Sequence, residues 1–251
     1  MAKQKGIIKL KGTLGDITFY KSKDGYLARE RGGVDANRIA NDPNFQRTRE
    51  NGEEFGRADK AGRMLRTSIR ALLQNVADSR MVGRLTQAMV KVIQADATSI
   101  RGKRNVIDGE AELLQGFEFN IRSKLGSVLY APYATTIDRE TGNLSINIPS
   151  FIPANMIAAP VSGTHFKLIA AGAAVDFENE IFEVVTAETA EIAWDSVATA
   201  VINLDHALTA ASINPLFLAL GIEFYQEVNG VRYPLKNGVY NALSLVQVDG
   251  A

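Results

Sequence analysis

The side chains with the clearest chemical pattern are cations in the first half of the chain. Arg63, Arg66 and Arg70 follow one another at i, i+3 and i+7, a spacing that places them along one stripe of a helix. A second group surrounds the N-terminal segment and consists of Lys9, Lys11, Lys21, Lys23 and Arg29. Clustered lysines and arginines attract phosphate and carboxylate groups, so these residues are the first candidates for a binding surface.

Acidic side chains form the complementary pattern in the second half. Asp176, Glu178 and Glu180 alternate along the chain, and alternate residues of a strand share one face. The glycine-bent, oxygen-rich loop of an EF-hand is missing around them. We therefore expect a solvated strand face or a turn rather than a calcium site, and we expect cations of another surface to face it.

No segment of the chain has the pattern of a catalytic or cofactor site. The two histidines, His165 and His206, lack metal-ligand spacing to each other. Neither the G-x-S-x-G nucleophile motif nor a glycine-rich phosphate loop occurs. The lack of cysteine excludes disulfides, thiolate catalysis and iron–sulfur clusters. We predict a protein that is not an enzyme and that holds no cofactor and no metal ion.

The charge is divided between the two halves of the chain. Residues 1–126 contain 24 Lys/Arg and 15 Asp/Glu, a formal balance of +9, whereas residues 127–251 carry −9. Opposite charges attract over about one Debye length, roughly 8–10 Å at ordinary salt. Three partners fit this asymmetry: an acidic polymer such as nucleic acid, the acidic half of another copy, or the acidic half of the same chain.

The first half of the chain predicts strands followed by helices. Apolar residues alternate with lysines over residues 7–11, which predicts a strand, and Lys23-Asp24-Gly25 marks a hairpin turn. Asp42-Pro43 predicts a helix start, an N-cap followed by proline. Apolar residues then recur at helical spacing through residues 65–76 and 81–93, and a short helix follows at 110–114.

Three glycines interrupt the front of the first predicted helix. Gly52, Gly56 and Gly62 each cost up to ~1 kcal/mol relative to alanine in a helix. Close approach of another backbone is the usual reason to keep such glycines. We therefore expect tight packing against this part of the helix.

The pattern changes near residue 116. From residue 134 onward, short apolar segments between turn residues predict about eight strands, and Asn229-Gly230 is the strongest hairpin signal. Such a series favours an antiparallel immunoglobulin-like β-sandwich. The expected fold class is thus α+β, with a basic hairpin-plus-helical domain at 1–116 and an acidic β-sandwich domain at 117–251.

Three segments of the first half also resemble a known group of sequences: Gly12–Lys21, Asp24–Arg29 and Asn44–Arg49. They are similar to uncharacterised proteins of Bacteroidota in which a glycine-bounded N-terminal hairpin precedes a Gln/Arg-bearing helix and a C-terminal sandwich. The resemblance implies no activity and assigns no functional residue. By analogy of fold, the arrangement also suits a virion, tail or filament subunit.

These patterns lead to one functional prediction and one alternative. We expect a non-enzymatic structural subunit that self-assembles as a filament, a ring or a virion- or tail-like particle, through basic-to-acidic contacts and strand addition by the N-terminal segment. The alternative is a nucleic-acid-binding protein that grips phosphate with its basic half.

The expected location follows from the distribution of apolar residues. Lysines interrupt the apolar stretch that a signal peptide would need near the N-terminus, and no apolar run approaches the ~20 residues of a membrane span. We therefore expect synthesis in the cytoplasm without membrane insertion, with release as part of a particle as a further route.

Overall fold

The computed structural model describes residues 2–30, 32–235 and 239–250 and divides into two compact units. The N-terminal unit comprises Met1–Arg49, and the C-terminal unit comprises Glu50–Ala251. This division differs from the predicted domains at 1–116 and 117–251. The reason is that the helices after residue 50 share one hydrophobic core with the sandwich and form no body of their own. The change of pattern near residue 116 is a change of secondary structure within one unit.

The N-terminal unit begins with a sheet of four short strands in the order β1-β4-β3-β2. The strands are β1 (Ala2–Lys3), β2 (Gly12–Leu14), β3 (Ile17–Ser22) and β4 (Gly25–Glu30). The predicted hairpin is confirmed: β3 pairs with β4, and Gly25 after the turn has φ of 107°, which glycine adopts without strain.

The strand predicted over residues 7–11 is wrong, because residues 4–11 form a loop between β1 and β2. The Gln4 side chain closes this loop: its Oε1 accepts a hydrogen bond from Leu10 N at 2.9 Å, and its Nε2 donates to Leu10 O at 3.3 Å. Residues 7–11 therefore pair with no neighbouring strand, although their apolar and polar residues alternate as in a strand.

A short helix, α1 (Ala36–Asn41), and a 3₁₀ helix, η1 (Pro43–Phe45), complete the N-terminal unit. The predicted helix start at Asp42-Pro43 is confirmed. The Asp42 carboxylate caps η1 by accepting a hydrogen bond from Asn44 N at 2.9 Å, and α2 follows directly.

The helices from residue 46 onward are α2 (Gln46–Ser68), α3 (Arg70–Leu73), α4 (Met81–Gln94), the 3₁₀ helix η2 (Ala111–Leu114), α5 (Leu125–Val128) and α6 (Pro153–Met156). The apolar residues predicted to be buried over 65–76 and 81–93 are buried, but the first segment is not one helix: it breaks at Ile69, which also places Arg70 on α3 and Arg63 and Arg66 on α2. Leu65 and Ile69 are buried on the first stripe, and Leu85 and Met89 are buried on the second.

The strands of the C-terminal unit form two sheets. They are β5 (Ala134–Asp138), β6 (Asn143–Ile148), β7 (His165–Asp176), β8 (Ile181–Glu188), β9 (Ile192–Ala193), β10 (Ile202–Ala207), β11 (Leu216–Val228), β12 (Val231–Pro234) and β13 (Ala242–Asp249). The smaller sheet has the order β10-β6-β5, and the larger has β12-β11-β7-β8, with β13 also paired to β11 and β9 to β7. Chain crossings between the sheets after β6, before β10 and after β10 give the connectivity of an immunoglobulin-like sandwich. The predicted fold class is confirmed.

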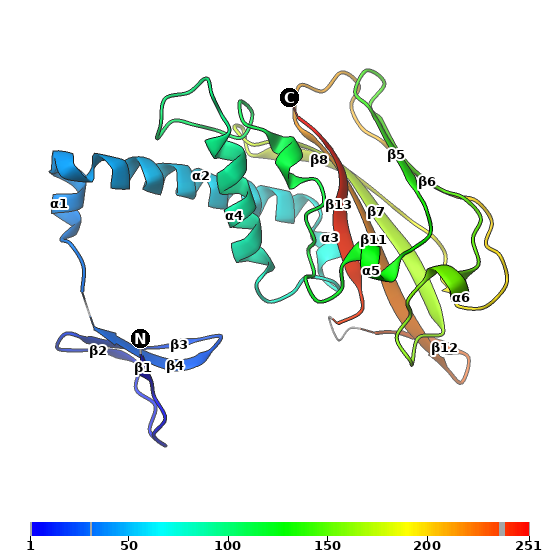
Figure 1. The fold of residues 1–251 in the computed structure, drawn as a ribbon, viewed down its shortest axis with the longest axis horizontal. Coiled ribbons are helices and arrows are strands. Elements are labelled where there is room, and N and C mark those ends of the chain that lie inside the picture. Colours follow the sequence, from blue (N-terminus) through cyan, green and yellow to red (C-terminus); the bar gives the residue numbers. More distant parts are fainter. Residues whose placement is uncertain (1, 31, 236–238, 251) are drawn as a thin grey trace. The chain divides into compact units, whose positions relative to one another are not determined.

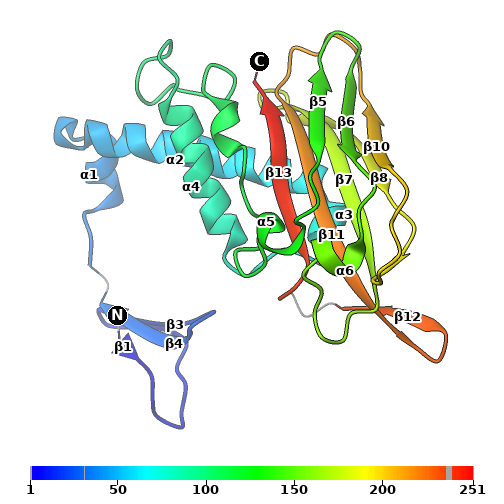
Figure 2. The ribbon, with the colours of Figure 1, turned by 45° about the vertical axis from the view of Figure 1, so that its right-hand side comes forward.

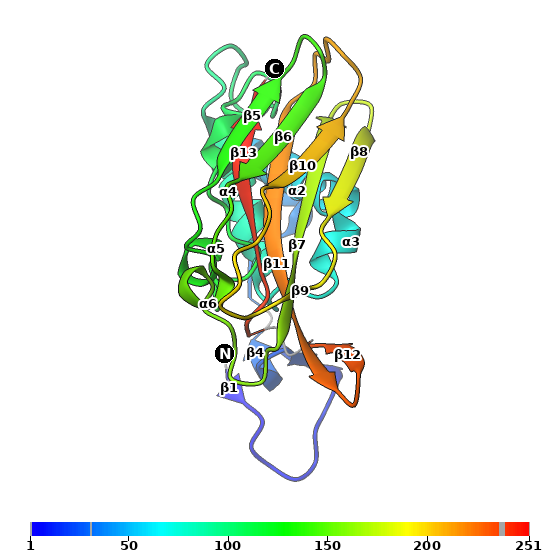
Figure 3. The same cartoon turned by 90° about the vertical axis from the view of Figure 1, so that its right-hand side faces the viewer.

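The larger sheet is covered on both faces, by helices on one side and by the smaller sheet on the other (Figures 1, 2 and 3). Adjacent residues of β11 show this division. Phe217 belongs to the core that includes Leu65 and Leu85 of the helices, and Leu218 belongs to the core that includes Leu144 of β6. Successive strand residues point to opposite faces, so both faces of β11 must be apolar.

The glycines Gly52, Gly56 and Gly62, which lie within α2, do not serve the expected close packing. A Cβ placed at Gly52 or Gly56 would meet nothing within 4 Å, and one at Gly62 would lie 3.6 Å from a Leu85 side-chain atom, an ordinary contact. Close packing occurs instead at glycines such as Gly172 of β7, where a Cβ would lie 2.8 Å from the Cβ of His206. At this position the two sheets of the sandwich approach closely, at a glycine that periodicity did not single out.

Candidate functional site

The N-terminal unit has a sheet but no core. None of its described residues is buried. The register pairs Leu14 with Ile17 and Phe19 with Ala28, and residues directly opposite each other share a face. That face has an apolar centre, with Glu30 and Lys21 beside it, and carries a hollow of about 550 Å³ lined by Ala2, Ile17 and Ala28 and by the charged residues Asp16, Arg29 and Glu30. A small sheet is stable when its apolar face packs against another surface, so we expect a partner surface to cover this face.

The candidate cations of the N-terminal segment gather around two tyrosines of the same sheet. Lys9 Nζ and Lys21 Nζ lie 6.0 and 5.7 Å from the ring centre of Tyr26. The Arg29 guanidinium lies 5.6 Å from the ring centre of Tyr20. Of the other two candidates, Lys11 precedes β2 and Lys23 lies in the β3–β4 turn, both exposed. Tyrosine faces attract cations, so the sheet holds much of its positive charge close to its surface.

The arginine stripe lies in the other unit. Arg63 pairs with Asp59 one helical turn earlier at 3.5 Å, and Arg66 Nε donates to Gly62 O at 3.1 Å. Arg70 is exposed at the start of α3. The predicted basic half is therefore distributed over both units. By sequence, the N-terminal unit contains 11 Lys/Arg and 5 Asp/Glu, a balance of +6, which leaves −6 for the C-terminal unit.

The acidic candidates lie at the hairpin between β7 and β8. Asp176 ends β7, and its carboxylate accepts hydrogen bonds from Glu178 N at 3.0 Å and Asn179 N at 2.9 Å. The Asn179 hydrogen bonds lower the pKa of Asp176. Glu180 has φ of 60° and lies 2.8 Å from Lys60 Nζ. Of the two expectations, the turn is right and the shared strand face is wrong, because the chain reverses within the acidic run.

Docking of the basic stripe on the sandwich of the same chain finds little support in these contacts. Lys60–Glu180 is an ion pair between α2 and the sandwich, but Arg63 and Arg70 are exposed. The helices contact the larger sheet chiefly through the apolar core that contains Leu65 and Phe217. The charge of the arginine stripe is thus not neutralised by the sandwich of its own copy.

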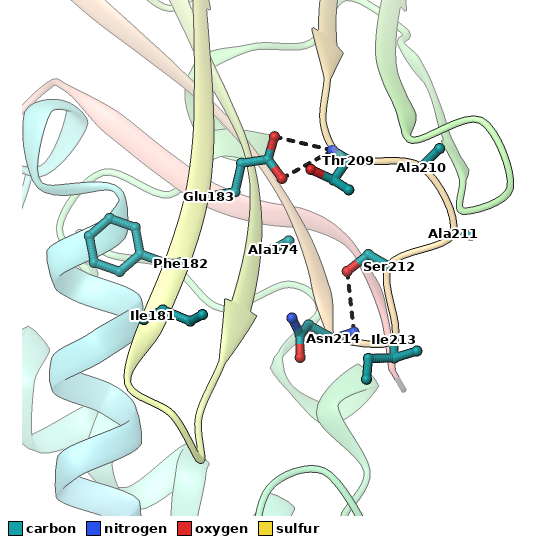
Figure 4. Close-up of a pocket in the computed structure, with 10 residues that line it drawn as sticks. All are labelled: Ala174, Ile181, Phe182, Glu183, Thr209, Ala210, Ala211, Ser212, Ile213 and Asn214. Carbon is teal, nitrogen blue, oxygen red and sulfur yellow. Dashed lines mark hydrogen bonds between the residues drawn. The ribbon is translucent and has the colours of Figure 1, made fainter.

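A pocket of about 380 Å³ lies between β8 and the segment 209–214 (Figure 4). Both oxygens of Glu183 accept a hydrogen bond from Thr209 N, at 3.1 and 3.0 Å, which ties this segment to β8. Ile181 and Ile213 line the pocket and are strongly exposed. The pocket therefore combines an apolar rim with one carboxylate, a composition that accepts an apolar side chain beside a cation.

A second pocket, of about 410 Å³, is lined by three cations, two of which bind neighbouring groups. Arg57 donates to Arg104 O at 2.8 Å, and Lys60 pairs with Glu180. Lys103 lies in the loop after α4, and Glu178 adds a negative charge to the lining. Because charges of both signs line it, this pocket makes a weaker anion site than its three cations suggest.

Sequence reasoning missed a polar cluster on the helix-facing side of the larger sheet. Glu223 of β11 is buried, and its carboxylate accepts hydrogen bonds from Asn75 Nδ2 at 2.9 Å and from the Tyr225 hydroxyl at 3.1 Å. Beside it, Lys167 Nζ donates to Glu188 at 3.0 Å. A lone glutamate within an apolar strand was the signal that could have revealed it.

The pKa values of this cluster favour a structural role. Burial raises the pKa of Tyr225, and the charge of Glu223 raises it further. Partial burial lowers the pKa of Lys167, but the Glu188 and Tyr225 interactions outweigh it and leave the pKa raised. Both shifts move away from neutral pH, so neither group is activated for proton transfer there.

The histidines lie in separate places. His206 is buried against the larger sheet, and burial lowers its pKa. His165 Nε2 lies 3.7 Å from a Glu227 oxygen. Within residues 2–30, 32–235 and 239–250, no group of three or more His, Asp or Glu side chains is arranged to hold a metal ion.

In the part of the chain that the structure describes, no helix has the length and apolar character needed to cross a bilayer. Comparison with known proteins found no matching family model, no matching curated protein and no matching solved structure. The resemblance to proteins of Bacteroidota therefore stays a prediction, and the surfaces described above are the basis for assigning a function.

Proposed function

We propose that this protein is a non-enzymatic structural subunit that assembles with copies of itself through heterologous contacts. In these contacts the N-terminal unit of one copy meets the C-terminal unit of the next. When two different faces meet, each end of an oligomer still exposes one unused face. Further copies can therefore add to form a filament, or the two ends can meet to close a ring. A virion- or tail-like particle uses the same kind of contact.

The observation that carries this proposal is the coreless sheet of the N-terminal unit. Its face with Leu14, Ile17, Phe19 and Ala28 places apolar side chains in water. Burial of apolar surface contributes about 25 cal/mol for each Å² removed from water. An apolar face of this kind is typical of an interaction site, and its cover in an assembly is the neighbouring copy.

The charges of the two units support a second copy as the partner. The N-terminal unit carries +6 and the C-terminal unit −6 by sequence, so different units of two copies attract and like units repel. Such complementarity orients the encounter and fixes which surfaces meet. Since the attraction decays over roughly 8–10 Å at ordinary salt, assembly should weaken as salt rises.

The test compares the full chain with a variant that lacks residues 1–49. Sedimentation at micromolar concentration should show large species for the full chain at low salt and monomers for the shortened chain. The shortened chain should stay folded with a melting temperature close to that of the full chain, because both hydrophobic cores consist of residues after 50.

Two outcomes would contradict the proposal. A full chain that stays monomeric at low salt would overturn self-assembly. Salt-sensitive binding of the monomeric chain to DNA or RNA in a gel-shift titration would favour the nucleic-acid alternative instead. Electron microscopy of the assembled material distinguishes filaments from rings.

A further inference from the structure

We propose that the loop Gln4–Lys11 of one copy inserts Ile7 and Ile8 into the pocket between β8 and residues 209–214 of the next copy. This inference rests on the proposed self-assembly and identifies the two surfaces that meet. The loop is called the donor loop below, and the pocket of Figure 4 the acceptor pocket.

The donor loop presents two adjacent isoleucines to solvent. Ile7 is 101% exposed and Ile8 is 79% exposed relative to an extended peptide. The base of the loop is held by Gln4, whose Nε2 donates to Leu27 O at 3.0 Å, in addition to its two bonds with Leu10. Lys9 Nζ also donates to Gln4 O. A loop with a closed base loses less conformational freedom on binding than a free tail, which favours affinity.

The acceptor pocket offers a concave site with exposed isoleucines for such side chains. Ile181 is 62% exposed and points into the pocket from β8, Ile213 is 84% exposed on the opposite side, and the Phe182 ring points away from it (Figure 4). The Glu183–Thr209 hydrogen bonds hold the two walls together, so the pocket exists before a partner arrives. Apolar anchors that enter preformed pockets are the usual centre of a protein–protein interface.

The charges around the two surfaces are complementary. Lys5 and Lys9 flank the isoleucines of the donor loop. Glu183 is the one acidic residue in the lining of the acceptor pocket, and the nearby turn before β8 carries Glu180, which pairs with Lys60, and Glu178 of the second pocket. Apolar contacts at the centre with opposite charges at the rim are the common arrangement of a specific interface. Insertion of the loop into the second pocket would bring Lys5 and Lys9 close to Arg57, Lys60 and Lys103, and like charges repel.

The test is a complementation experiment with two double variants. The donor variant carries Ile7→Asp and Ile8→Asp, and the acceptor variant carries Ile181→Asp and Ile213→Asp. Each variant alone should associate at least tenfold more weakly than the natural chain. Mixed together, they should form one-to-one dimers and nothing larger, because one copy retains an intact pocket and the other an intact loop.

A control adds one aspartate at an exposed apolar position elsewhere. Val161 is 108% exposed, so Val161→Asp should assemble like the natural chain. Circular dichroism of every variant shows that a loss of assembly is not a loss of folding. Failure of the mixture to form dimers, with both variants folded, would overturn the inference.

The lack of cysteine in the chain allows a direct test of proximity. Ile8→Cys in one copy and Ser212→Cys in another should form a mixed disulfide on mild oxidation, whereas Ile8→Cys with Val161→Cys should not. If loss of residues 1–49 abolishes assembly but the donor variant assembles normally, the proposed function stands and this inference falls. If the shortened chain still assembles, both fall.

Discussion

Replacement of Asp96 by alanine should release the loop that follows α4. The Asp96 carboxylate accepts hydrogen bonds from the backbone N–H groups of Thr98 at 2.8 Å, Ser99 at 2.9 Å and Asn105 at 3.1 Å, and from the Thr98 hydroxyl at 3.0 Å. Asp96 itself is 1% exposed. One carboxylate therefore fixes both ends of the segment that carries Lys103 of the second pocket.

The size of the effect follows from these bonds. A hydrogen bond to a charged group contributes about 1.5–3 kcal/mol when its loss leaves a donor unpaired. Thr98 is exposed, so part of the freed donors will bind water instead. We expect Asp96→Ala to lower the free energy of unfolding by about 2–4 kcal/mol, and Asp96→Asn, which retains one oxygen acceptor, by about 1–2 kcal/mol.

The effect should also depend on pH. Burial raises the pKa of Asp96, but hydrogen bonds from Ser99, Asn105 and Thr98 outweigh it and hold the pKa far below the ordinary 3.8. Because the folded pKa is lower than the unfolded one, the stabilisation is complete above the unfolded pKa and is lost as pH falls toward the folded value. The difference between the natural chain and Asp96→Ala should therefore shrink below about pH 4.

Urea unfolding followed by circular dichroism, at neutral pH and at about pH 3, measures the loss of unfolding free energy and its dependence on pH. Two results would refute the reasoning. One is an Asp96→Ala variant within about 0.5 kcal/mol of the natural chain at neutral pH. The other is an equal difference between the two proteins at both pH values.

Further predictions concern the two cores and a buried histidine. Leu65→Ala should lower the free energy of unfolding by about 3–5 kcal/mol in urea titrations, because Leu65 is fully buried between helix and sheet. Gly172→Ala should lower the free energy of unfolding by about 1–3 kcal/mol, because the added Cβ would meet His206. Gly56→Ala should raise the free energy of unfolding by up to ~1 kcal/mol, because a Cβ at Gly56 meets nothing within 4 Å and alanine favours the helix. Burial lowers the pKa of His206 below 6.5, so the unfolded state binds a proton at a higher pH than the folded state does. The free energy of unfolding should therefore fall as the pH drops below 6.5. His206→Gln should remove this part of the pH dependence in melting curves.

The elements that the sequence predicted well are those with local causes. The Asp42-Pro43 helix start depends on one side chain and its next residues, and the Asn229-Gly230 turn depends on two residues whose φ values, 52° and 77°, are both positive. β11, which spans Leu216–Val228, ends directly before this turn. These signals are contained within a few residues, so periodicity and turn chemistry suffice to read them.

The elements that sequence reasoning missed depend on distant partners. The loop at residues 4–11 forms because Gln4 bonds to Leu10 and Leu27, which alternation cannot reveal. Glu223 is held by Asn75 from far earlier in the chain. The apolar stripe of α2 was visible, but not the sheet that covers it. The boundary predicted near residue 116 consequently divided one core in two.

The sheet covered on both faces has a consequence for synthesis of the protein. Helices α2 and α4 leave the ribosome well before β7 and β11, and their core is completed by Leu243, Leu245 and Val248 of β13, the last strand described. Contacts between segments so far apart in sequence form slowly. Until β13 emerges, the nascent helices expose an apolar stripe that chaperones recognise and that promotes aggregation. A ribosome-stalled chain that ends before residue 242 should therefore be sensitive to protease along α2 and α4, and the full-length chain should be resistant.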